Sequence, residues 1–161
     1  MVDKYTAVVE WLMNCPSVKN NSTYFNFAKV VKDNTKQIVT VANDKILNQA
    51  YVDGGVLRRF TFTLIDYKSV AYRAIAKVSG ASNEDIEDIL QVQEIIDWVV
   101  EQAENRNYPD FGDDCIIDSL EPSTDTPNLN GVDTNATPAL AKYSVSIQIQ
   151  YLDTSKVLWN K

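Results

Sequence analysis

The fold is decided by the stretch Tyr143–Tyr151, which reads YSVSIQIQY. Tyrosine, valine and isoleucine alternate there with serine and glutamine, and successive side chains of a strand point to opposite faces. The stretch therefore predicts a β-strand with one apolar face for the core. Its other face carries Ser144, Ser146, Gln148 and Gln150, which are polar without charge. Such a face suits either solvent or the close approach of another subunit.

Further strands are predicted towards the N-terminus. The segment Val56–Ile65 alternates aromatic and aliphatic residues with arginine and threonine, the pattern of a half-buried strand. Three other segments rich in β-branched or aromatic residues also predict strands: Thr23–Val31, Gln37–Val41 and Cys115–Leu120. The turn signal Asp33-Asn34 makes the first two of these a predicted hairpin. The stretch Asp66–Gly80 is expected to be mostly connection.

Two helices are predicted. The first has an apolar stripe from Tyr5 to Met13, with Asp3 as its N-cap and Pro16 as its stop. The second carries a longer stripe that runs to about Glu104, and Ser82 begins it with a capping pattern. The order of elements predicts an α+β fold, a mostly antiparallel sheet of four to five strands with the N-terminal helix and one long helix packed on one face.

The chain is expected to form a single domain over residues 1–161, with a long loop at 121–138 and a C-terminal tail at 153–161. The loop segment holds three prolines and several Asn, Asp and Thr residues, and it has no Lys or Arg. A loop of that length and low apolar content is expected to be functional or mobile. The tail ends in Val157, Leu158 and Trp159, whose apolar side chains need a partner in the same subunit or the next.

The composition argues against several functional classes. A formal net charge of −7 makes the chain a poor general binder of nucleic acid, because phosphate contacts need clustered Lys and Arg. No window approaches the roughly 20 apolar residues of a membrane span, and no signal peptide is expected. The two cysteines, Cys15 and Cys115, are expected to be reduced thiols, although a disulfide depends on a distance that the sequence does not give.

Catalytic chemistry finds little support. There is no histidine, which removes the usual general base and the commonest transition-metal ligand. A calcium site could be formed by Asp110, Asp113 and Asp114, but a solvated acidic loop is the stronger explanation of these residues. An acid–base pair could lie within Glu84–Asp88, but acidic residues are also typical of the first turn of a helix. A basic patch could comprise Arg58, Arg59, Lys68 and Arg73, but strand-edge charges account for the two arginines equally well.

Three segments of the C-terminal half form a recognisable set: Ile95–Gln102, Tyr108-Pro109 and Ala139–Leu152. This half resembles the tail-terminator and tail-completion proteins of tailed phages and phage-derived particles of Gram-positive bacteria, and Arg58–Leu64 looks like the central strand of that family. The resemblance implies a homo-hexameric ring at the head-proximal end of the tail tube, which would stop tube polymerisation and join the tail to the neck. A ring needs a head-to-tail interface with rotational closure.

The implied partners are further copies of the chain, the tail tube protein, a neck or head–tail connector protein and a sheath protein. DNA would pass through the lumen without specific binding. The implied location is a virion or phage-tail-like particle assembled in the host cytoplasm, and no cofactor, metal or membrane is expected. The candidate oligomer interface is Tyr143, Ser144, Ser146, Gln148, Gln150, Val157, Leu158 and Trp159. The candidate lumen or partner loop contributes Glu121, Asp125, Asn128, Asn130 and Asp133.

Three alternatives stay open. The first is another structural role, as a neck, head-completion or minor capsid protein. The second is a small enzyme that uses carboxylates alone. The third is a stand-alone binding module.

Overall fold

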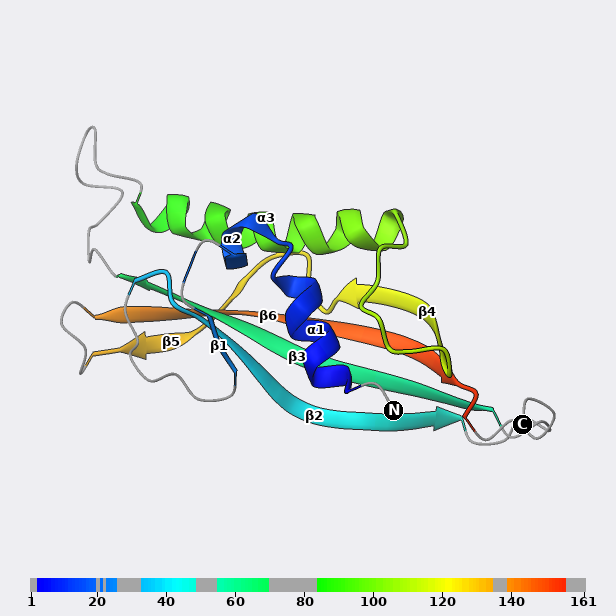
Figure 1. Ribbon diagram of the computed structural model, residues 1–161. Coiled ribbons are helices and arrows are strands. Elements are labelled where there is room, and N and C mark those ends of the chain that lie inside the picture. The colour runs from blue at the N-terminus through cyan, green and yellow to red at the C-terminus, as the bar shows by residue number, and fades with distance from the viewer. Residues whose placement is uncertain are drawn as a thin grey trace.

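A computed structural model describes residues 3–19, 21, 23–25, 33–48, 55–69, 84–134 and 139–155. The described residues form three helices and six strands (Figure 1). The helices are α1 (Lys4–Leu12), α2 (Pro16–Lys19) and α3 (Glu84–Glu104). The strands are β1 (Thr23–Phe25), β2 (Lys36–Asn48), β3 (Val56–Ser69), β4 (Cys115–Pro122), β5 (Asn128–Asp133) and β6 (Leu140–Asp153).

The strands form one sheet in the order β1-β2-β3-β6-β4, and β5 also pairs with β6. β4 pairs with residues 147–153 of β6 and β5 pairs with residues 140–144, so the two short strands follow one another along the same side of β6. Every pairing is antiparallel except that of β1 with β2. The predicted α+β class with a mostly antiparallel sheet is confirmed, with six strands in place of four or five.

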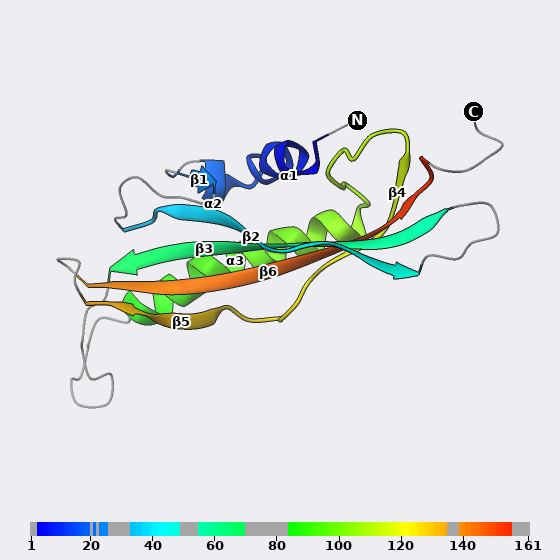
Figure 2. The same ribbon diagram turned by 90° about the horizontal axis from the view of Figure 1, so that it is seen from below.

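The long central strands have one face in the core. Phe60, Phe62 and Leu64 of β3 lie directly opposite Ile149, Ile147 and Val145 of β6, so all six side chains share a face. Buried residues of α1 and α3 belong to the same apolar cluster. In Figure 1, α3 runs along the sheet and α1 crosses it. In the view from below, α3 lies behind β3 and β6, and none of the described helices lies in front of these strands (Figure 2). The helices therefore cover one face, as predicted.

The first helix begins as its sequence indicates. The Asp3 carboxylate accepts a hydrogen bond of 2.9 Å from the backbone N–H of Tyr5, which satisfies one of the free donors of the first turn. The helix ends at Leu12, and Pro16 opens α2 where it was expected only to stop a helix. Proline is suited to a first helical turn, because the N–H it lacks would have no helical acceptor there.

The predicted hairpin of Thr23–Val31 with Gln37–Val41 is wrong. β1 pairs with β2 in parallel, with Thr23 opposite Lys36, and a parallel pair cannot be closed by a tight turn. Asn34 does adopt a positive φ of 67°, which fits a turn. This turn packs against the end of β3, where the Asn34 N–H donates to the Tyr67 carbonyl over 2.7 Å. Residues 26–32, which the predicted first strand included, lie outside the described residues.

Two segments expected to lack regular structure contain strand. β3 continues through Ser69, into the stretch assigned to a connection. The expected loop at 121–138 begins inside β4 and contains β5, whose register against β6 shifts between Leu129 and Val132. Gly131 has a φ of 131° at this irregularity, a conformation that favours glycine. Residues 135–138 and 156–161, and the start of the long helix at Ser82, lie outside the described residues.

Candidate functional site

The face of the sheet opposite the helices carries a row of uncharged polar side chains. The antiparallel register sets Thr61 opposite Gln148 and Thr63 opposite Ser146, and the two hydroxyl groups of the latter pair lie 2.9 Å apart. We call the row the polar stripe; it comprises Thr61, Thr63, Ser144, Ser146, Gln148 and Gln150. The predicted separation of Ser144, Ser146, Gln148 and Gln150 from the apolar face of their strand is confirmed.

The candidate interface must be corrected at its first residues. Tyr143 is buried on the helix face, 8% exposed and opposite Asp66, because it belongs to the apolar alternation of β6. Ser144 is on the open face but is only 6% exposed, since β6 is flanked there by both β3 and β5. Ser146, Gln148 and Gln150 are half-buried and remain candidates. Val157, Leu158 and Trp159 lie outside the described residues.

Arg59 adjoins the polar stripe and has an unmet donor. It lies opposite Gln150 on the open face. Its Nε atom is buried, yet it has no hydrogen-bond partner in the described structure. An unpaired buried donor carries a desolvation cost, so an acceptor supplied from outside this subunit would stabilise it.

The three described cations of the hypothetical basic patch do not share one face of the sheet. Arg58 lies on the helix face of β3, where its Nε is 3.2 Å from the Asp153 carboxylate. Lys68 is buried on that same face, whereas Arg59 is on the other. Arg73 lies outside the described residues. Successive side chains of a strand point to opposite faces of the sheet, so Arg58 and Arg59 are separated although they are adjacent in sequence.

One end of the open face is apolar. Leu57 and Ile116 both lie opposite Leu152, and Ile116 is 59% exposed. At the other end of β6, Leu129 and Val132 of β5 are 57% and 40% exposed, and they lie opposite Tyr143 and Ala141 of the helix face. Sequence reasoning missed both groups, because the register of the short strands decides which face each of their apolar residues is on.

The candidate lumen residues are spread along β4 and β5. Glu121 lies opposite Gln148, and Asn128 lies opposite Ser144, so both border the polar stripe. Asp125 is exposed between the strands, and its carbonyl accepts a hydrogen bond of 2.9 Å from Gln93 of α3. Asn130 is exposed in β5, and Asp133 is half-buried at its end. The structure thus places four of these residues on the edge strands β4 and β5, and Asp125 in the segment that joins the two strands.

A second feature is a buried cluster of three charges. Lys36 Nζ lies 2.8 Å from Asp66 Oδ1, and Lys68 Nζ lies 3.7 Å from Asp66 Oδ2; all three side chains are 2% exposed. Lys68 also donates to Gln91 of α3 over 2.7 Å and to Asn34. Asp66 Oδ2 is buried and has no hydrogen-bond partner among the described residues. Sequence reasoning did not single out this cluster.

Burial sets the electrostatics of this cluster. Loss of hydration raises the pKa of Asp66 above its ordinary value, against the opposing effect of the two lysine charges. Loss of hydration likewise lowers the pKa of Lys36, which the Asp66 charge partly offsets. The cluster opens into a pocket of about 380 Å³ that is also lined by Pro16, Ser17, Asn21, Asn34, Gln91 and Glu94.

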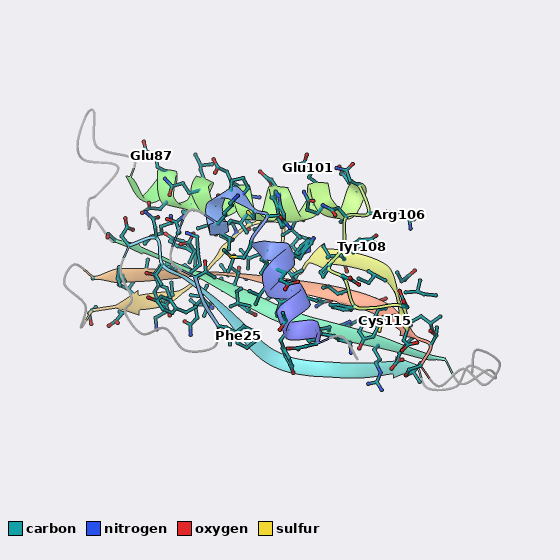
Figure 3. All side chains as sticks on the ribbon, viewed as in Figure 1. Phe25, Glu87, Glu101, Arg106, Tyr108 and Cys115 are labelled. Carbon is teal, nitrogen blue, oxygen red and sulfur yellow. The ribbon has the colours of Figure 1, made fainter. Side chains whose placement is uncertain are left out.

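The carboxylate hypotheses gain no geometric support. Within the described ranges, no group of three or more His, Cys, Asp or Glu side chains is arranged to hold a metal ion. Asp110 accepts a hydrogen bond of 2.9 Å from the Gly112 N–H, which is a local turn contact. Glu87, in the first turns of α3, points away from the sheet (Figure 3). Cys15 and Cys115 are not joined in a disulfide.

No family model matches the sequence, and no curated protein matches it either. The comparisons therefore leave the family open. Of the helices in the described part of the chain, none combines the length and the apolarity needed to cross a bilayer.

Proposed function

We propose that the chain is a structural subunit of a phage-type tail. It assembles head to tail with copies of itself into a hexameric ring at the head-proximal end of the tail tube. There it ends tube polymerisation and joins the tail to the neck. The resemblance of Ile95–Gln102 and Ala139–Leu152 to tail-terminator proteins supports the proposal, and the open face of β3 and β6 is the observation that carries it.

The polar stripe suits a contact between subunits. Its threonine, serine and glutamine side chains can be covered without removing a full charge from water, and the cost of burying them is met when the partner supplies hydrogen bonds. Arg59 offers this contact a specific hydrogen-bond donor, because its buried Nε has no acceptor within the described subunit. Arginine is also enriched in interfaces. A neighbouring copy supplies the missing acceptor.

The edges of the sheet support head-to-tail growth. A ring requires that two different patches of one subunit meet. The described sheet ends in β1 and β2 on one side and in β4 and β5 on the other. The β5 edge exposes Leu129 and Val132, and apolar strand edges are ordinarily covered in soluble proteins. The segment 121–138 has no Lys or Arg, so it suits a channel in which DNA slides without phosphate contacts.

Two adjacent arginines provide a test with a matched control. Arg59→Met removes the guanidinium whose buried Nε has no hydrogen-bond partner among the described residues, whereas Arg58→Met removes one that pairs with Asp153 on the helix face. Sedimentation velocity should show a hexamer for the wild type and for Arg58→Met, and smaller species for Arg59→Met. If the two variants assemble alike, the open face is not the contact.

Electron microscopy of particles that lack the protein separates the structural roles. A terminator is required to stop tube growth, so its loss should give overlong tails. Tails of normal length that fail to join heads would instead assign the chain to the neck.

A further inference from the structure

We propose that the pocket at the buried charge cluster binds a small oxyanion that carries one acidic proton, of which hydrogen phosphate is the simplest. The pocket lies between β2, β3, α2 and α3, on the helix face and away from the polar stripe. The inference is independent of ring assembly, because it concerns other residues and a different face of the sheet.

The donors and acceptors of the cluster do not balance within the part of the chain that the structure describes. An ammonium group has three protons to donate. Lys36 donates two of its protons, one to Asp66 Oδ1 and one to the Asn34 carbonyl. Lys68 also donates two, one to the Asn34 side chain and one to the Gln91 side chain. Each lysine thus has one proton left over. Asp66 Oδ2 accepts no hydrogen bond, and Lys68 Nζ lies 3.7 Å away, beyond hydrogen-bond range.

The unmet groups define the ligand. Two spare ammonium protons require a ligand with at least two acceptor atoms. The free oxygen of Asp66 requires that the same ligand also donate a proton. A fully deprotonated oxyanion meets the first requirement but places an oxygen against the carboxylate. Hydrogen phosphate meets both requirements, since its P–OH group donates to Asp66 and its other oxygens accept from Lys36 and Lys68.

The surroundings form a built site. The three charged side chains are each 98% buried and are held by neighbouring strands, so they are ordered before any ligand arrives. Lys36 and Lys68 outnumber Asp66, which leaves one net positive charge in a buried setting where electrostatic attraction is strong. Glu94 also lines the pocket but is exposed, so solvent screens its charge. A cavity of about 380 Å³ admits a tetrahedral ion and leaves room for a substituent.

Sulfate is the discriminating probe, because it has the shape of phosphate and no proton at neutral pH. Isothermal titration of the full chain should show phosphate binding at least about tenfold tighter than sulfate, since a site built to accept a hydrogen bond rejects an analogue that cannot donate one. Equal affinity would overturn the proposal by showing simple attraction of anions. Absence of phosphate binding would also overturn it, and ordered water would then satisfy the cluster.

Asp66→Asn tests the origin of the selectivity. The amide can donate to sulfate, so the ratio of the two affinities should fall to about one in this variant. Glu101→Gln makes a similar acid-to-amide change on the outer side of α3, where the side chain points away from the sheet (Figure 3), and should leave the ratio unchanged. Unchanged selectivity in folded Asp66→Asn would overturn the assignment. If Asp66→Asn does not fold, the wild-type comparison alone decides.

Discussion

Lys36 and Asp66 lie directly opposite each other in the pairing of β2 with β3, and their side chains meet at 2.8 Å with 2% of each exposed. The two residues are 30 positions apart in sequence. Their contact exists only because the register of two strands brings them together on the helix face. The cluster that they form with Lys68 therefore depends on the correct pairing of β2 with β3.

Asp66→Ala should destabilise the protein strongly. The change leaves Lys36 and Lys68 buried without a counter-ion, and breaking a buried pair in this way costs about 3–5 kcal/mol. Asp153→Ala is the matched control, because its pair with Arg58 is partly exposed and is worth about 1 kcal/mol at most. Urea unfolding of both variants measures the difference. Equal losses would show that the buried cluster has no special weight.

The stability contributed by Asp66 should depend on pH in a defined direction. Burial raises the pKa of Asp66 from its ordinary value of 3.8, so the folded state holds this proton more tightly than the unfolded state. The contribution is fully present below 3.8 and is lost as pH rises through the folded-state pKa. The free energy of unfolding of the wild type, minus that of the non-titrating Asp66→Asn, should fall as pH rises from 3.8 towards neutrality. A rise over that range would contradict the assigned shift.

Trp11 should be a main anchor of α1. Its ring is 4.8 Å from that of Trp98 on α3, its Nε1 donates to the Asn107 carbonyl over 2.7 Å, and it is 4% exposed. Trp11→Ala should cost about 3–5 kcal/mol in the free energy of unfolding. Leu90→Ala, at a position 57% exposed on α3, should stay within about 0.5 kcal/mol of the wild type. A small effect at Trp11 would mean that α1 is not docked on α3 as described.

The two cysteines should differ in reactivity. Cys15 is 1% exposed, and burial raises the pKa of its thiol, so little reactive thiolate is available. Cys115 is partly exposed at the start of β4, towards the opposite end of the molecule from Glu87 (Figure 3). Iodoacetamide should label one site per native chain, and Cys115→Ser should abolish that labelling. Rapid labelling of both thiols in the native protein would contradict the burial of Cys15.

The long elements of this fold could be predicted because their signals are local. The alternation in Tyr143–Tyr151 revealed a strand and assigned its faces correctly, and the stripe before Glu104 revealed the long helix. β5 was missed because Asn128–Asp133 has the composition of a loop. Its strand geometry comes from pairing with β6, a contact that local propensity does not encode.

The candidate sites were harder to predict than the elements. Listing Tyr143 with the polar residues of its strand was wrong because alternation places it on the helix face, where it is buried. Lys36 and Asp66 sit near the ends of predicted strands, where charged residues are usually solvated. Only the β2–β3 register brings them together, and only α2 and α3 complete the pocket around them. Such non-local pairing is invisible to periodicity.

The most direct test of the central proposal is negative-stain electron microscopy of the purified wild-type protein, alone and mixed with tail tubes. Closure of the open face against a neighbouring copy predicts rings of uniform diameter with sixfold symmetry, free in solution or seated at tube ends. Isolated monomers at high protein concentration, together with bare tube ends in the mixture, would contradict it.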